Sequence, residues 1–141
     1  MADVSDYYKV ITCEDNLFHV ELGGFWSDEV MDKYNDAIQK IFRDSVLSFN
    51  GAPIIHFAHW TTTPALGPKA IAHVTESQQF FKAHNGYKVV ELIPSSMVKV
   101  GLRNAANKSG AEGDELRFVA KDLDDAWVII NKLKEELKNS K

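Results

Sequence analysis

The sequence predicts a single α/β domain with a mixed, mostly parallel sheet and the element order ββαβαβαβα. Two observations predict this class. Two strand-like segments near the N-terminus flank an acidic turn, and helical and strand-like segments then alternate to the end of the chain. Strands that are joined through helices pair in parallel, so the hairpin should extend a parallel sheet. The 141 residues, 45% of them hydrophobic, suit one core, so we expect one domain over residues 1–141, ordered from about residue 7 to about residue 137.

The first half of the chain should contain the hairpin, a helix and the central strand. Residues 7–13 and 17–22 have strand composition, and "EDN" at residues 14–16 supplies the turn. Residues 25–42 should form a helix with Ser27 as its N-cap, and residues 53–60, "PIIHFAHW", form an apolar run typical of a buried central strand. The predicted inner face of this helix is Val30, Met31, Tyr34, Ala37, Ile38, Ile41 and Phe42.

The second half should alternate between helices and strands. A helix should cover residues 68–84, with Gly67 as its cap and Pro68 in its first position, because proline has no N–H to lose there. Strands follow at residues 87–93 and 116–120, separated by a short helix at 96–106 capped by Ser95 and a loop at 107–115. Asp122 starts the last helix, whose predicted inner face is Leu123, Ala126, Trp127, Ile130, Leu133 and Leu137.

This order of elements, with "GGFW" before the first helix and "DLDDAW" at the last, resembles the STAS fold of anti-sigma-factor antagonists. In particular, it is similar to the STAS-like branch of bacterial single-domain proteins related to sporulation antagonists. The resemblance covers about residue 7 to about residue 137 and rests on element order rather than on a diagnostic motif. It implies a non-enzymatic regulatory module that binds a protein partner, for example an anti-sigma-factor-like kinase.

Signalling members of that family carry an Asp-Ser-x-Gly-like segment after the central strand, where a partner kinase phosphorylates the serine. Here the segment reads "TTTPALG", without the serine and without a preceding acidic residue. We expect Thr61, Thr62, Thr63 and Gly67 to form a binding or switch loop next to a helix N-terminus, which favours anions. Three interpretations stay open: hydroxyls that satisfy local backbone groups, a phosphorylated protein-binding surface over residues 61–68, and a site for a small anionic ligand.

Aromatic residues provide a rival hypothesis. Phe25, Trp26, His59 and Trp60 are candidates for an exposed aromatic surface or for the wall of a pocket, although core packing also explains such residues. STAS-related folds are similar in outline to lipid-carrying domains. A carrier or sensor of a small apolar or lipid ligand is therefore an alternative function.

Catalysis and metal binding have little support in the sequence. An odd spacing places His56 and His59 on opposite faces of one strand, so they should not share a metal ion, and we expect no metal or cofactor. We assign no catalytic residue, since a nucleophile elbow and a phosphate-binding glycine loop are both missing. A weak hydrolase that uses His56 or His59 as a base is a second alternative. Cys13, the single cysteine, excludes an internal disulfide and is expected to be a half-buried structural thiol.

Charge and hydropathy limit the partners. The net charge of −4 and the lack of a Lys/Arg cluster argue against nucleic-acid binding. No apolar run approaches the roughly 20 residues that span a bilayer, and the acidic start is unlike a signal peptide. We therefore expect a soluble, cytoplasmic protein.

Overall fold

The computed structural model describes residues 3–93, 98–103 and 116–139, and its centre is a five-stranded sheet. The strands are β1 (Tyr8–Glu14), β2 (Leu17–Leu22), β3 (Ile54–Trp60), β4 (Gly86–Leu92) and β5 (Arg117–Ala120), and they lie in this order across the sheet. β1 pairs antiparallel with β2, and every later pair is parallel. The mixed, mostly parallel sheet is thus confirmed, with β3 as its middle strand.

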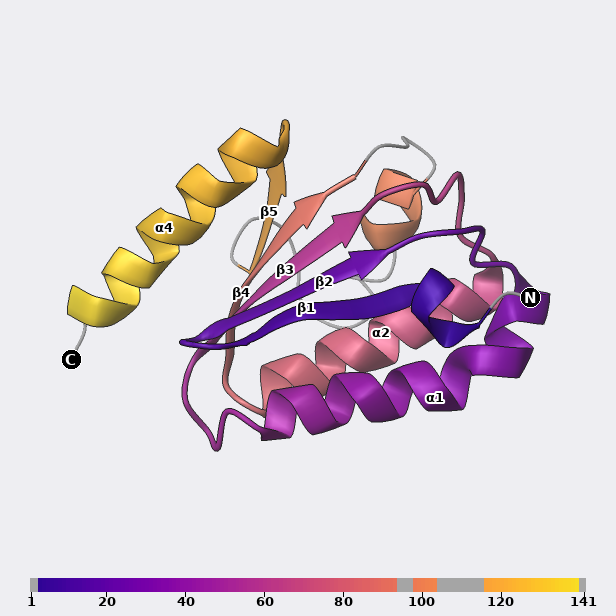
Figure 1. The fold of residues 1–141 in the computed structure, drawn as a ribbon, viewed down its shortest axis with the longest axis horizontal. Coiled ribbons are helices and arrows are strands. Elements are labelled where there is room, and N and C mark those ends of the chain that lie inside the picture. The colour runs from indigo at the N-terminus through magenta and orange to yellow at the C-terminus, as the bar shows by residue number, and fades with distance from the viewer. Residues whose placement is uncertain (1–2, 94–97, 104–115, 140–141) are drawn as a thin grey trace.

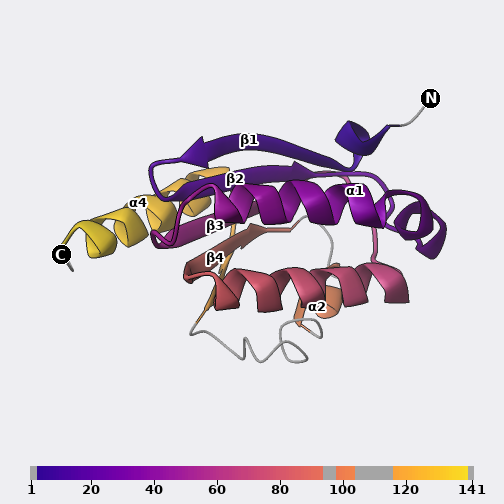
Figure 2. The ribbon, with the colours of Figure 1, turned by 90° about the horizontal axis from the view of Figure 1, so that it is seen from below.

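Helices cover both faces of the sheet. α1 (Asp28–Leu47) and α2 (Pro68–Ala83) lie side by side against one face, and α4 (Leu123–Asn139) packs on the other face (Figures 1 and 2). A single 3-10 turn, η1 (Val4–Asp6), precedes β1. Residues 98–103 are helical, as predicted for that region, whereas the predicted Ser95 cap and the loop at 107–115 lie outside the described residues.

Alternation along the strands divides the core into two apolar clusters. The even-numbered side chains of β3, from Ile54 to Trp60, face α1 and α2, whereas Ile55 and Phe57 face α4. Ile54, Ile55, Phe57 and Trp60 are each at most 2% exposed. A strand that buries both of its faces reads as a continuous apolar run, which is why the sequence identifies it so clearly.

Local chemistry explains the turns and helix starts. The hairpin reverses through Asp15 and Asn16, both at positive φ, which these residues tolerate better than most. The Ser27 hydroxyl accepts a hydrogen bond from the Val30 N–H at 3.2 Å, so the predicted N-cap is confirmed. α2 begins at Pro68 after Gly67, also as predicted.

Two predicted inner faces need correction. α1 continues to Leu47, five residues beyond the predicted end, and in it Ala37 is exposed whereas Gln39 is buried, because Gln39 bonds to His73 on α2. In α4, Leu123 is 45% exposed because it lies a turn ahead of Ala126, where the buried face of the helix begins.

Candidate functional site

The candidate site is built from two neighbouring loops at the carboxyl ends of β2 and β3. Because these strands are parallel and adjacent, residues 23–27 and residues 61–67 leave the sheet side by side. The Thr61 N–H donates to the Leu22 carbonyl at 2.7 Å, and the Gly67 N–H donates to the Trp26 carbonyl at 2.9 Å. Together with a parallel bridge between Trp26 and Leu66, these bonds join the two loops, which we call the paired loops, into one surface.

The three threonines of this surface differ in exposure and bonding. Thr61 and Thr62 are exposed, and both hydroxyls bond to the facing loop: Thr61 donates to the Leu22 carbonyl at 3.0 Å and Thr62 accepts from the Gly24 N–H at 3.0 Å. Thr63 is only 1% exposed, and its hydroxyl has no partner within the described part of the chain. Thr63 therefore differs from Thr61 and Thr62 in both exposure and bonding, and the sequence does not reveal this difference.

An acidic side chain already occupies the N-terminus of α2. The Lys69 N–H donates to Asp28 Oδ1 at 3.0 Å, and the Lys69 ammonium pairs with Asp32. A Cβ on Gly67 would approach Asp28 Oδ1 to 2.9 Å, so glycine permits this close contact. The positive end of the α2 dipole is thus neutralised by a carboxylate from α1, which competes with any external anion there.

The aromatic candidates do not form one patch. Trp26 and Trp60 are 1% and 2% exposed and meet edge to face with ring centroids 5.0 Å apart, so neither forms an exposed surface. Phe25 is 53% exposed on the paired loops. His59 points to the opposite face of the sheet, where it stacks on Phe57 at 5.7 Å. The structure therefore brings Phe25 together with Thr61 and Thr62, and separates His59 from them.

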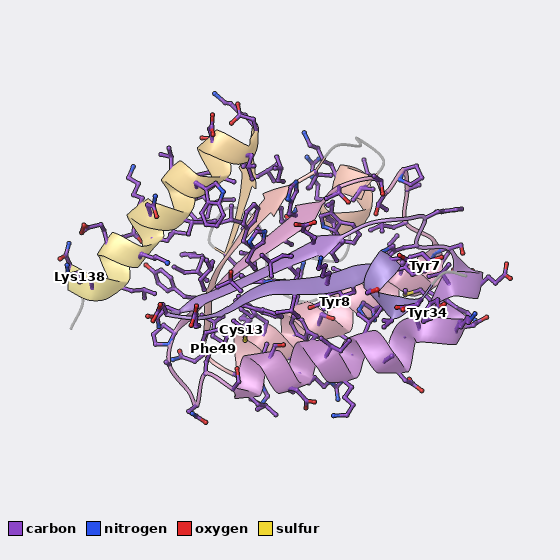
Figure 3. The ribbon with its side chains drawn as sticks, viewed as in Figure 1. Tyr7, Tyr8, Cys13, Tyr34, Phe49 and Lys138 are labelled. Carbon is purple, nitrogen blue, oxygen red and sulfur yellow. The ribbon has the colours of Figure 1, made fainter. Side chains whose placement is uncertain are left out.

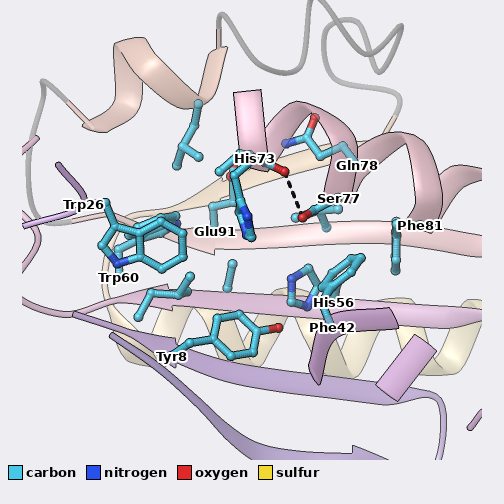
Figure 4. A pocket seen from close by; sticks show the side chains of 15 residues that line it. Tyr8, Trp26, Phe42, His56, Trp60, His73, Ser77, Gln78, Phe81 and Glu91 are labelled. Carbon is cyan, nitrogen blue, oxygen red and sulfur yellow. Dashed lines mark hydrogen bonds between the residues drawn. The ribbon is translucent and has the colours of Figure 1, made fainter. Parts of the chain in front are cut away.

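Below the paired loops, a cavity of about 50 Å³ lies between the sheet and the two helices. Figure 4 shows its wall, in which Trp26 and Trp60 stand at one end and side chains from β1, β3 and α2 surround the rest. Pockets for drug-sized ligands have about 300 Å³ or more. The cavity is therefore too small for an acyl chain, which argues against the lipid-carrier alternative.

Two histidines border this cavity, and burial lowers the pKa of each to about 4. His56 Nδ1 lies 3.0 Å from the Phe18 carbonyl oxygen, and His73 Nδ1 lies 2.6 Å from Asn35 Oδ1. Both rings are therefore neutral near pH 7. His56 is confirmed on the face of β3 opposite His59, so the two rings do not share one site.

A carboxylate also borders the cavity. Glu91 of β4 is 2% exposed, and Arg117 of β5 approaches its Oε1 to 2.5 Å through Nη2 and to 2.6 Å through Nε. Burial raises the pKa of the Glu91 carboxyl, and the Arg117 charge opposes that rise. Glu91 and Tyr8 were not predicted as lining residues, although the glutamate in the largely apolar run "YKVVELI" was a signal of a buried charge.

On the face of the sheet that α4 covers, aromatic side chains stack on one another. His19 stacks on Phe57 with centroids 4.4 Å apart, and Trp127 from α4 meets His19 edge-on at 5.6 Å. Burial lowers the pKa of His19. Within the described ranges, no group of three or more His, Cys, Asp or Glu side chains is placed to hold a metal ion.

Cys13 lies apart from the paired loops. Its Sγ is 3.6 Å from the Ser45 carbonyl oxygen and 3.3 Å from Ser48 Oγ, and it packs near Phe49 at the far end of α1 (Figure 3). The thiol is half-buried, as predicted. Among the helices of the described segments, none combines the length and the apolar character needed to cross a membrane.

Comparisons with known proteins agree with the fold. No protein-family model and no curated protein sequence matches the chain. The structure of the Bacillus cell fate determinant SpoIIAA in its phosphorylated form matches with a TM-score of 0.55 and 12% sequence identity, covering 89% of this chain and 98% of that one. The STAS-like fold predicted from the element order is thereby confirmed, and at this identity the likeness concerns the fold alone.

Proposed function

We propose that the chain is a non-enzymatic regulatory module of anti-sigma-factor-antagonist type, and that it binds a protein partner through the paired loops. The observation that carries the proposal is the position of Phe25, Thr61 and Thr62. These exposed side chains share one surface at the carboxyl ends of parallel strands, where α/β folds place binding residues. The fold is shared with SpoIIAA, whose structure was determined in a phosphorylated form, and this supports a regulatory role of the same type.

The paired loops are well prepared for binding because they are anchored from below. The Trp26 indole N–H donates to the Gly23 carbonyl at 3.0 Å, and its ring packs against Trp60, the residue before Thr61. A surface that is ordered before binding loses less conformational entropy when a partner docks. Phe25 then offers exposed apolar area on this surface, and Thr61 and Thr62 offer polar groups.

Binding is switched by charge in this proposal. Thr61 and Thr62 are accessible to a kinase, whereas Thr63 becomes accessible only if the loop opens. A phosphate on Thr61 would remove the hydroxyl proton that bonds to the Leu22 carbonyl, but the ester oxygen of a phosphorylated Thr62 could still accept from the Gly24 N–H. Thr62 is therefore the better-suited acceptor.

Repulsion, rather than docking onto α2, is the proposed effect of this phosphate. Asp28 already accepts the Lys69 N–H at the start of α2, so an added phosphate would meet a carboxylate there. A phosphate carries about −1.5 to −2 charges at pH 7 and would weaken binding to an acidic partner surface. The fold itself does not need to change.

Affinity capture from the native cell tests the proposal. We expect a tagged full-length chain to recover a specific protein, Phe25→Ser to recover at least about tenfold less of it, and Thr62→Glu to weaken recovery similarly. Val128→Ser is the matched control, because Val128 is 64% exposed on α4, on the opposite face of the sheet. Equal recovery by wild type and Phe25→Ser, or no specific partner, would contradict the binding surface. Absence of phosphothreonine by mass spectrometry would contradict the switch alone.

A further inference from the structure

The cavity below the paired loops is lined by polar groups whose hydrogen bonding the protein leaves incomplete. The Tyr8 hydroxyl and the Trp60 indole N–H are both buried, and neither has a hydrogen-bond partner among the described residues. A buried polar group that is left without a hydrogen bond destabilises the fold. Both residues border the cavity, so a hydrogen-bonding guest inside it could remove this destabilisation.

The two histidines supply acceptors to the same space. A carbonyl oxygen only accepts, so the Phe18 carbonyl at 3.0 Å requires the proton of His56 on Nδ1. His73 Nδ1 lies 2.6 Å from Asn35 Oδ1 and 3.2 Å from Gln39 Nε2. The shorter contact is to an acceptor and places the His73 proton on Nδ1, and the Gln39 amide then donates to the His73 backbone carbonyl at 3.3 Å instead. In the neutral rings, Nε2 of each is then an unprotonated acceptor. Figure 4 shows Tyr8 and His73 reaching toward the same space from opposite sides, with His56 beside them.

Size decides which guest fits. On the scale where one water needs about 10–15 Å³, a volume of about 50 Å³ holds about three to five waters. Water both donates and accepts hydrogen bonds, so it suits a lining with donors from Tyr8 and Trp60 and acceptors from His56 and His73. The same lining also contains the polar side chains of Ser77, Gln78 and Glu91. Larger organic ligands do not fit this space.

We infer that this cavity is a water site, in which up to about three to five ordered waters connect Tyr8 of β1, His56 and Trp60 of β3, and His73 of α2. The waters would join β1, β3 and α2. Because Trp60 precedes Thr61 and packs on Trp26, the hydrated cavity also supports the paired loops from below. This inference stands on the cavity alone and does not depend on the proposed partner.

A high-resolution crystal structure of the full chain, together with water–protein NOE and ROE spectra, tests the inference. We expect ordered water within hydrogen-bond distance of Tyr8 Oη and of one histidine Nε2, and cross-peaks from long-lived water to protons lining the cavity. Tyr8→Phe should lose at least one of these waters. Tyr87→Phe is the matched control, because the Tyr87 hydroxyl bonds to Glu136 at the surface, and it should keep all of them.

Trp60→Phe removes the second donor and serves as an independent variant if Tyr8→Phe does not fold. An empty cavity in the wild-type crystal, with no long-lived water signal, would overturn the inference. Electron density for a molecule larger than water would overturn it as well. Unchanged water occupancy in both variants would show that the Tyr8 hydroxyl and the Trp60 indole N–H do not bind the waters, which would also overturn the inference.

Discussion

His73 connects three features of the molecule through one side chain. Its ring borders the internal cavity, meets Trp26 edge-on with centroids 5.5 Å apart, and bonds to Asn35 on α1. Gln39 of α1 also donates to the His73 backbone carbonyl at 3.3 Å. The residue therefore holds α1 and α2 together beneath the paired loops.

Acidification should destabilise the fold through His73. Burial lowers its pKa from 6.5 to about 4, so between these values the unfolded chain binds more protons than the folded chain. The stability that His73 contributes is full above pH 6.5 and falls as the pH decreases, by about 3 kcal/mol at pH 4. Urea unfolding at pH 7 and pH 4.5 should show a smaller loss for His73→Gln than for wild type. Identical losses would mean that this ring is not buried in its neutral form.

At the scale of elements, the start of α2 depends on α1. Gly67 offers no side chain to cap α2, and the missing acceptor comes from Asp28 in the first turn of α1. The two helix starts are therefore coupled, although 41 positions separate Asp28 from Lys69. Pro68 predicts where α2 begins, but the partner that caps it follows only from the packing of the two helices.

Asp28→Ala should destabilise the protein by about 1 kcal/mol, the usual cost of losing an N-terminal cap acceptor. Asp28→Asn, which keeps a side-chain oxygen, should recover most of this loss. Glu29→Ala is the control, because Glu29 is an exposed acidic residue in the same turn of α1. The midpoint of urea unfolding measures all three variants. An equal effect of Asp28→Ala and Glu29→Ala would indicate helix-dipole electrostatics rather than the bond to Lys69.

At the scale of the whole molecule, two helical layers protect a sheet that is apolar on both faces. On the α4 side, Ile55, Phe57 and Val90 are all fully buried, and Ala126, Ile130 and Leu133 of α4 belong to the same cluster. Parallel sheets occur with both faces covered because their strands are apolar throughout. α4 is therefore part of the core, and the sheet that carries the paired loops depends on helices on both of its faces.

A chain that ends at residue 121 should lose this cover. We expect it to bind the dye ANS, to aggregate and to lack a cooperative unfolding transition, because the apolar face of β3 and β4 would meet water. A chain that ends at Leu137 keeps the buried face of α4 and should unfold like the full chain. If the shorter chain also unfolded cooperatively with unchanged stability, α4 would not be part of the core.

Much of the fold was predictable because its signals are local. Turn residues mark the hairpin, Ser27 and Pro68 mark helix starts, and the run at residues 53–60 marks a strand that is buried on both faces. The exposure of Leu123 was not predictable, because hydrophobicity alone does not reveal how far a helix extends past its neighbours. The exposure of Ala37 was not predictable either, because the bond between Gln39 and His73 of α2 turns Gln39 inward. The candidate site was predicted only in its place along the chain, since contacts across the two loops decide which threonines are exposed.

The sequence by itself determined the order and type of the elements, the central position of β3, and the opposite orientations of His56 and His59, because these follow from periodicity and turn chemistry. Only the tertiary structure decided that Trp26 and Trp60 are buried together and that Asp28 caps α2. It also decided that Tyr8, His56, His73 and Trp60 surround one small cavity. These contacts join residues that are far apart in the sequence, and only the packing of the helices on the sheet brings them within bonding distance.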